Sequence, residues 1–77
     1  MERPLFTSTL MRDEHVRSFQ VMHAPTGGWE VTERLDQRRL FRHRHTDWQR
    51  VEATLRRFAK VIAALKEQGW SETQSLA

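Results

Sequence analysis

The strongest structural signal in this chain is residues 46–70, which have the pattern of one amphipathic helix with a recognisable start and stop. Steps of about 100° per residue bring its apolar side chains into one stripe. The stripe contains Trp48, Val51, Leu55, Phe58, Ala59, Ile62 and Leu65. Thr46 followed by Gln49 fits a capping box, and Gly69 followed by Trp70 fits a Schellman-type stop. Such a stripe has to be buried, so we expect the helix to pack on another element.

Residues before the helix have the pattern of β-strands. His15 to His23 contains Val16, Phe19, Val21 and Met22 with polar residues among them, and residues 24–28 form a turn. Trp29 to Glu33 alternates apolar and polar residues. A third strand from Arg38 to about His43 follows a short loop at residues 35–37. We therefore predict an α+β fold, a three-stranded antiparallel meander with one C-terminal helix packed across one face. The strand residues expected to meet the helix stripe are Phe19, Val21, Trp29, Val31 and Phe41.

The pairing of the last two strands has two possible registers, because Leu40 and Phe41 are consecutive apolar residues and a one-residue slip exchanges the faces. We favour Phe41 inward, with Val31 opposite Phe41 and Glu33 opposite Arg39, which is a favourable charge pair. In that register the uncovered face of the sheet shows Val16, Ser18, Gln20, Met22, Glu30, Thr32, Leu40, Arg42 and Arg44.

The domain organisation follows from these elements. Residues 15–70 form the predicted β-β-β-α domain, and residues 71–77 form a polar tail that we expect to be loose. Residues 1–14 fit an added edge strand, an arm that reaches a second subunit, or a disordered lead. With 77 residues, the chain is short for a single core to be stable alone, which makes self-association a reasonable expectation.

Val21, the turn ending in Gly28-Trp29, Val31 and the helix beginning at Thr46 together resemble small bacterial domains of unknown function. Those domains have a strand, a Gly-Trp-x-Val hairpin, a third strand and a Thr-initiated helix. The resemblance covers about residues 17–68 and differs at Trp48 and Val51, where small alanines are more usual. It implies the same fold and no particular activity.

Composition removes several classes of chemistry. The chain has no cysteine, which excludes disulfides, thiolate nucleophiles and cysteine-ligated metal centres. It has no apolar run near the roughly 20 residues needed to cross a bilayer, and residues 1–10 lack the apolar block of a secretory signal. We therefore expect a cytoplasmic protein without a membrane partner.

Positive charge is concentrated in the second half of the chain. Thirteen basic residues against ten acidic residues give a net charge of +3. Most of the basic residues are arginine, which suits bidentate contacts to phosphate. Codon usage and the needs of a solvated helix face explain such charge better than a phosphate-binding role does. A nucleic-acid interface would use arginines of the third strand and the helix, namely Arg38, Arg42, Arg44, Arg50 and Arg57.

No metal or catalytic site is predicted. His43 and His45 would share one face of a strand, but a metal usually needs three or four converging ligands. The chain contains serines, carboxylates and histidines without a spacing that predicts a nucleophile and its base. We expect no enzymatic activity, no cofactor, no metal and no catalytic residue.

Apolar residues without a place in the predicted core suggest an interaction surface. They are Leu5, Phe6, Leu10 and Met11 near the N-terminus and Val16, Met22 and Leu40 on the uncovered face. We therefore predict a non-enzymatic interaction module that forms a homodimer or contacts another protein. The alternative is a nucleic-acid-binding protein.

Overall fold

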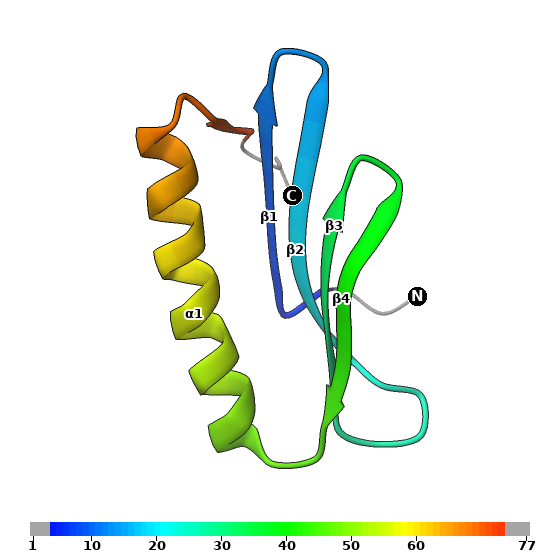
Figure 1. The fold of residues 1–77 in the computed structure, drawn as a ribbon. Helices are drawn as coiled ribbons and strands as arrows, with labels where there is room; N and C mark the ends of the chain where they lie inside the picture. Colours follow the sequence, from blue (N-terminus) through cyan, green and yellow to red (C-terminus); the bar gives the residue numbers. More distant parts are fainter. Residues whose placement is uncertain (1–3, 74–77) are drawn as a thin grey trace.

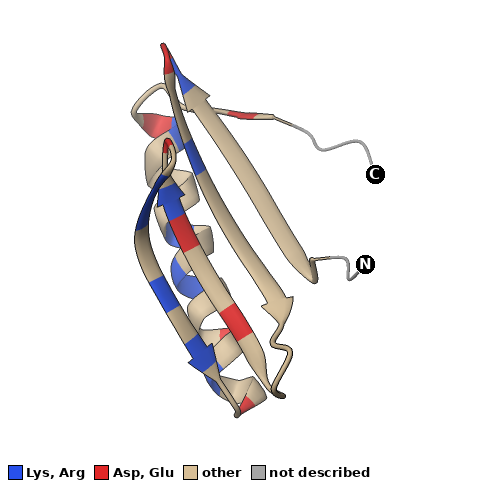
Figure 2. Cartoon of the chain, turned by 90° about the vertical axis from the view of Figure 1, so that its right-hand side faces the viewer, with Lys and Arg blue, Asp and Glu red and all other residues tan. Residues whose placement is uncertain are grey.

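The computed structural model describes residues 4–73, which form one antiparallel sheet and one helix. The elements are β1 (Phe6–Arg12), β2 (His15–His23), β3 (Trp29–Leu35), β4 (Arg38–His45), α1 (Trp48–Glu67) and β5 (Ser71–Thr73). The strand order in the sheet is β4-β3-β2-β1-β5 (Figure 1). We call the side of the sheet that α1 covers the helix face, and the other side the open face (Figure 2). The predicted α+β class and meander with a following helix are confirmed, and two strands are added to the predicted three.

The N-terminal segment forms β1, which lies inside the sheet between β2 and β5. A two-residue loop at Asp13-Glu14 joins β1 to β2, so that Arg12 lies opposite His15. Asp13 has a φ of 54°, a left-handed conformation that Asp tolerates better than most residues. The loop between β3 and β4 is built in the same way, with Asp36 at a φ of 56°. Residues 6–12 therefore add a strand to the three that were predicted. Because this strand lies inside the sheet, residues 6–12 are neither a free arm nor an edge strand.

The segment after the helix corrects one prediction, because residues 71–73 form β5 where a loose tail was expected. Residues 74–77 lie outside the described part of the chain. Ser8 Oγ donates a hydrogen bond to Glu72 Oε2 over 2.5 Å, and Lys66 Nζ lies 2.7 Å from Glu72 Oε1. The hydrogen bond from Lys66, and then that from Ser8, lowers the pKa of Glu72 below its ordinary value. These contacts join β5 to β1 and to the last turn of α1.

The two ends of α1 agree with the sequence to different degrees. The N-cap is Asp47, whose Oδ1 accepts a hydrogen bond from the Gln49 N–H at 2.9 Å, so the prediction that Thr46 caps the helix was wrong. The strand before the helix continues to His45, and Asp47 is the residue with extended backbone next to the first turn. At the other end, Gly69 has a φ of 97° and the Trp70 N–H bonds to the Leu65 carbonyl at 3.0 Å. The predicted Schellman stop is confirmed.

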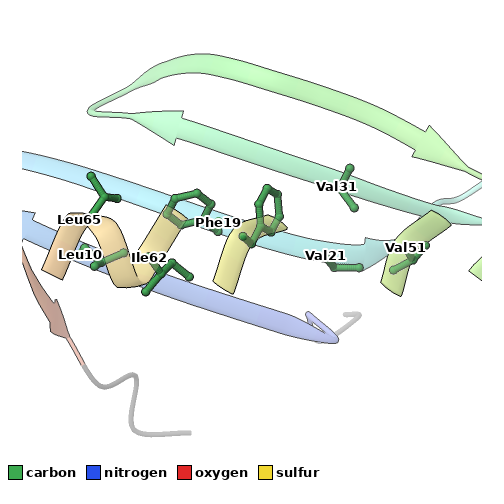
Figure 3. Packing of buried hydrophobic residues seen from close by; sticks show 8 residues of the cluster. Leu10, Phe19, Val21, Val31, Val51, Ile62 and Leu65 are labelled. Carbon is green, nitrogen blue, oxygen red and sulfur yellow. The ribbon is translucent and has the colours of Figure 1, made fainter. Parts of the chain in front are cut away.

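The core lies between the helix face and α1 (Figure 3). The rings of Phe19 and Phe58 meet at its centre with centroids 5.0 Å apart. Trp29 and Phe41 are partly buried against this cluster, and Trp48 is 41% exposed with its ring edge against Trp29. The buried apolar residues are Leu10, Phe19, Val21 and Val31 from the sheet and Val51, Phe58, Ile62 and Leu65 from α1.

The register of β3 and β4 differs from the predicted one. Val31 lies opposite His43, and Glu33 lies opposite Phe41, which is two residues away from the expected pairing. A shift of two residues keeps the faces, so Phe41 packs against the core as preferred. Between Glu33 and Arg34 the register shifts, so that Leu40 is an extra residue on β4, and it is 42% exposed. This β-bulge lets two consecutive apolar residues occur without both being buried.

The predicted pair between Glu33 and Arg39 is also corrected. Because of the bulge, Arg39 lies opposite Arg34, on the open face. The Glu33 carboxylate instead forms an ion pair with Arg17 of β2 on the helix face, where both side chains are mostly buried. The guanidinium carbon of Arg17 also lies 5.7 Å from the centroid of the Phe19 ring. The charge pair on the helix face is thus made between β2 and β3.

Candidate interaction surface

β4 is an outer strand of the sheet and the most basic element of the fold. Its inner side pairs with β3, and within residues 4–73 no strand pairs with its outer side. The outer backbone N–H and C=O groups of such a strand are available to another chain. Four of the eight residues of β4 are arginine, two are histidine and none is acidic. Any partner of this edge meets unpaired backbone groups flanked by positive charge.

β4 carries several basic residues (Figure 2), and two of its arginines, Arg42 and Arg44, lie on the open face. Arg42 Nη2 donates to Glu30 Oε2 at 2.9 Å, and both side chains remain partly exposed. Arg44 Nε donates to the Gly27 carbonyl at 2.8 Å, which fixes the side chain on the turn between β2 and β3. This contact leaves the charge of Arg44 without a carboxylate partner in the described part of the chain. The open face near β4 therefore carries net positive charge.

On the helix face, β4 borders an open groove of about 390 Å³ between the strand and α1. The strand side consists of Phe41, His43 and His45, which alternate along β4. The ring centroids of Phe41 and His43 are 6.3 Å apart, and those of His43 and His45 are 4.4 Å apart. The helix side consists of Ala53, Thr54 and Arg57. We call this feature the β4–α1 groove.

Arg57 of α1 lines the β4–α1 groove beside Phe41. Its guanidinium carbon lies 4.7 Å from the centroid of the Phe41 ring and 5.5 Å from that of Phe58. Cation–π contacts of this kind hold an arginine side chain over an aromatic face. The groove therefore combines an apolar floor with a fixed positive charge, and no acidic side chain lines it.

His45 closes the groove at its other end. Burial lowers the pKa of His45, and the charges of His43 and Arg50 lower it further, against an opposing effect of Asp47. Thr54 Oγ1 lies 3.4 Å from His45 Nε2 and donates to the Arg50 carbonyl at 3.0 Å. The pKa of His45 therefore lies below its ordinary value, so folding disfavours protonation of this imidazole.

The histidines do not converge on a metal site. His43 and His45 are neighbours, whereas the ring of His15 bonds to Asp36 at 3.1 Å and that of His23 packs near Trp29. No group of three or more His, Cys, Asp or Glu residues in residues 4–73 is arranged to hold a metal ion. The imidazole pair is best described as part of the groove wall.

The arginines predicted for a nucleic-acid interface divide between the two faces. Arg42 and Arg44 lie on the open face, while Arg57 lines the β4–α1 groove and Arg50 lies in the first turn of α1 near His45. Arg38 lies opposite Leu35 at the hairpin end of β4. These cations therefore surround the β4 edge on both sides and do not form one flat patch.

The apolar residues predicted for an interaction surface are separated by the fold. Leu10 is fully buried and Phe6 packs against the core, both on the helix face, so neither belongs to a surface. The sequence allowed residues 1–14 to form an added strand, but it did not identify the partner strands of Phe6 and Leu10. Leu5 and Met11 are exposed by 48% and 42%.

The three open-face apolar residues do not form a continuous patch. Val16 and Met22 lie at opposite ends of β2 with Ser18 and Gln20 between them, and Leu40 lies in the bulge of β4. Met11 lies directly opposite Val16, so these two make a small apolar pair at one end of the open face. The Leu5 N–H bonds to the Val21 carbonyl, which puts Leu5 at the end occupied by Met22.

The β4–α1 groove was not predicted from the sequence. Phe41 was expected to meet the helix stripe, and His43 and His45 were interpreted only as a pair of histidines. The signal for the groove was the alternation of Phe41, His43 and His45 with arginines along one strand. The helix in residues 4–73, α1, is not long and apolar enough to span a membrane.

Comparison with known proteins identified no similar protein. No protein-family model matches this chain, and neither the curated proteins nor the solved structures contain a match. The functional argument therefore depends on the groups at the β4 edge and in the β4–α1 groove.

Proposed function

We propose that this protein is a non-enzymatic interaction module that binds an acidic partner protein through the β4 edge and the β4–α1 groove. The single observation that carries the proposal is an eight-residue outer strand whose outer side is unpaired within residues 4–73 and which contains no acidic residue. Proteins commonly protect such edges with charge, which discourages pairing between identical copies. The same charge attracts a segment of opposite sign.

Charge also argues against one route to a homodimer. Two β4 strands paired with each other would bring arginines and histidines together without a carboxylate from either strand. Self-association is therefore expected through the open face, where the exposed Met11 lies opposite the partly buried Val16. A heterologous acidic partner suits β4 better than a second copy does.

Nucleic acid is the second candidate, and one observation favours it. Arg57 and the rings of Phe41 and His43 lie together in an open groove, which is a combination that single-stranded nucleic acids use for phosphate contact and base stacking. Duplexes fit less well, because the arginines do not lie in one plane.

The two candidates can be separated by titration of the isotope-labelled protein, followed by NMR. The probes are poly-glutamate, a 12-residue oligo-deoxythymidine and a mixed-sequence RNA duplex, each at about 50 and 200 mM salt. Shifts in residues 38–57 that occur with poly-glutamate support the proposal. Stronger binding of oligo-deoxythymidine would favour nucleic acid, and no binding of any probe at low salt would reject both.

Matched variants locate the site. Arg42→Gln with Arg57→Gln removes two charges from the β4 edge and the groove. Arg56→Gln with Lys60→Gln removes the same charge from α1 residues that lie outside the groove lining. We expect the first pair to reduce binding at least about tenfold and the second pair to have little effect, since only the first pair contacts the site. Equal losses would mean that binding reflects net charge alone.

A further inference from the structure

We infer that the β4 edge accepts an extended segment with alternating acidic and apolar residues, which adds to the sheet as a sixth strand. This inference rests on the proposed function and specifies the form of the partner. It commits to a peptide in β-conformation, with apolar side chains directed to the β4–α1 groove and carboxylates directed to the open face. Strand addition of this kind obtains affinity from main-chain hydrogen bonds and specificity from alternate side chains.

The backbone of β4 sets the length of this segment. The bulge at Leu40 interrupts regular pairing, and residue 46 leads away into the cap of α1. Regular strand remains between Phe41 and His45. At about 3.3 Å per residue this stretch is roughly 17 Å long, which corresponds to a docked segment of about five residues.

The two faces of β4 set the alternation. On the helix face, side chains from an added strand would lie beside Phe41 and His43 and across from Ala53, and the Arg57 guanidinium is the one cation of the groove lining that is held over the Phe41 ring. On the open face, the neighbours would be Arg42 and Arg44. Side chains on one face of adjacent strands interact in pairs, so carboxylates suit one set of positions and valine or phenylalanine suits the other.

Two observations favour a peptide over a nucleic acid at this edge. A row of outward backbone N–H and C=O groups is matched by another peptide backbone, whereas nucleic acid has no equivalent alternation of donors and acceptors. In addition, one face of the Phe41 ring is occupied by Arg57, and the rings of His43 and His45 are tilted by 51° to each other. The groove is therefore a poor platform for successive stacked bases.

The experiment compares two fluorescent peptides of identical composition. One has the order Glu-Val-Glu-Phe-Glu-Val-Glu, and the other has its four glutamates together followed by the three apolar residues. Binding to the full chain is measured by fluorescence anisotropy. We expect the alternating peptide to bind at least about tenfold more tightly, because only this order directs all carboxylates to one face of a strand.

N-methylation then tests the main-chain hydrogen bonds. In a strand, successive N–H groups point to opposite edges, so methyl groups on the odd or the even residues block different edges. One methylated alternating peptide should lose binding, and the other should retain it. Strand addition also predicts slower hydrogen exchange of β4 amides in the complex than in the free protein.

Variants of the protein test the two faces separately. Ala53→Leu fills the β4–α1 groove from an exposed helix position and should weaken binding of the alternating peptide several-fold. Arg42→Gln should do so from the open face, and Arg56→Gln is the control for charge. Circular dichroism confirms that each variant is folded.

The possible results distinguish the inference from the proposed function. Order-dependent binding, with sensitivity to one methylation pattern and to both site variants, supports the inference. Equal binding of the two peptides, or insensitivity to methylation, overturns strand addition and leaves a basic surface that binds acidic polypeptides. Tighter binding of oligo-deoxythymidine than of either peptide overturns the inference in favour of nucleic acid. No binding by any probe rejects the proposed function as well.

Discussion

The guanidinium carbon of Arg57 lies 4.7 Å from the centroid of the Phe41 ring, which joins the middle of α1 to the outer strand of the sheet. This contact shapes the β4–α1 groove, because it holds the Arg57 cation over the face of the Phe41 ring and both residues line the groove. It also shows that the helix does not close completely over β4. An edge strand with an accessible groove on one side and arginines on the other is the main candidate for function.

The centre of the core should be the most sensitive to truncation. Phe58 is fully buried against Phe19, so Phe58→Ala should destabilise the domain by about 3–5 kcal/mol through lost burial and a residual cavity. Trp48→Ala removes a larger side chain that is 41% exposed, and we expect a smaller loss. Urea denaturation of both variants measures the difference. A larger loss for Trp48→Ala would contradict this packing.

The N-cap should depend on Asp47. Asp47→Ala removes the acceptor of the Gln49 N–H and should cost about 1 kcal/mol of stability. Thr46→Ala is the matched control and should cost less, because no cap contact of its side chain is found in the structure. Thermal unfolding of the two variants decides between the caps. A larger loss of stability for Thr46→Ala than for Asp47→Ala would instead support the capping box expected from the sequence.

The two glycines of the turn between β2 and β3 should differ in tolerance. A Cβ on Gly28 would lie 2.5 Å from the carbonyl oxygen of His45, whereas a Cβ on Gly27 would meet nothing within 4 Å. Both residues have positive φ, so Gly27→Ala should cost roughly 1–2 kcal/mol from backbone conformation alone. Gly28→Ala should cost clearly more. Chemical denaturation of the two variants provides the comparison, and equal costs would mean that the turn does not contact β4 as described.

Acidification should destabilise the protein partly through His45. Its pKa is lowered in the folded state, first by burial and then by His43 and Arg50. The unfolded chain therefore binds this proton more readily, and stability decreases as pH falls through the unfolded pKa near 6.5 toward the folded value. The decrease in melting temperature between pH 7.5 and 5.5 should be smaller for His45→Gln than for the wild type. His23→Gln is the control, because His23 is not among the groups that shift the pKa of His45. An unchanged decrease in His45→Gln would show that His45 does not contribute.

Self-association stays a prediction from the sequence, and the open face is where we expect the contact. At tens of micromolar, sedimentation should give about twice the 9.2 kDa chain mass if Met11 and Val16 form the contact. Changing both residues to lysine should then give a monomer. A wild-type mass of 9.2 kDa would end the homodimer hypothesis without affecting the proposed binding at β4.

Local signals in the sequence were enough to determine the helix, its Schellman stop, β2 and the turn before Trp29. Each of these depends on neighbouring residues, namely helical periodicity, a glycine with positive φ, or strand alternation beside a Gly-Gly turn. The helix stripe also predicted the buried side chains Val51, Phe58, Ile62 and Leu65 correctly. The N-cap differed by one residue because Thr46 and Asp47 are both good caps, and only the end of β4 distinguishes them.

Tertiary structure alone decided how the strands combine and where the candidate site lies. β1 has no clear alternation of apolar and polar residues, and its place between β2 and β5 depends on backbone pairing with distant residues, including the three-residue strand Ser71–Thr73. The bulge at Leu40 likewise depends on the partner strand, and it sends Phe41 to the helix face and Arg39 to the open face. The β4–α1 groove exists because α1 packs on the sheet without covering the helix face of β4 completely. Packing of this kind depends on side chains far apart in the chain, which local sequence patterns do not encode.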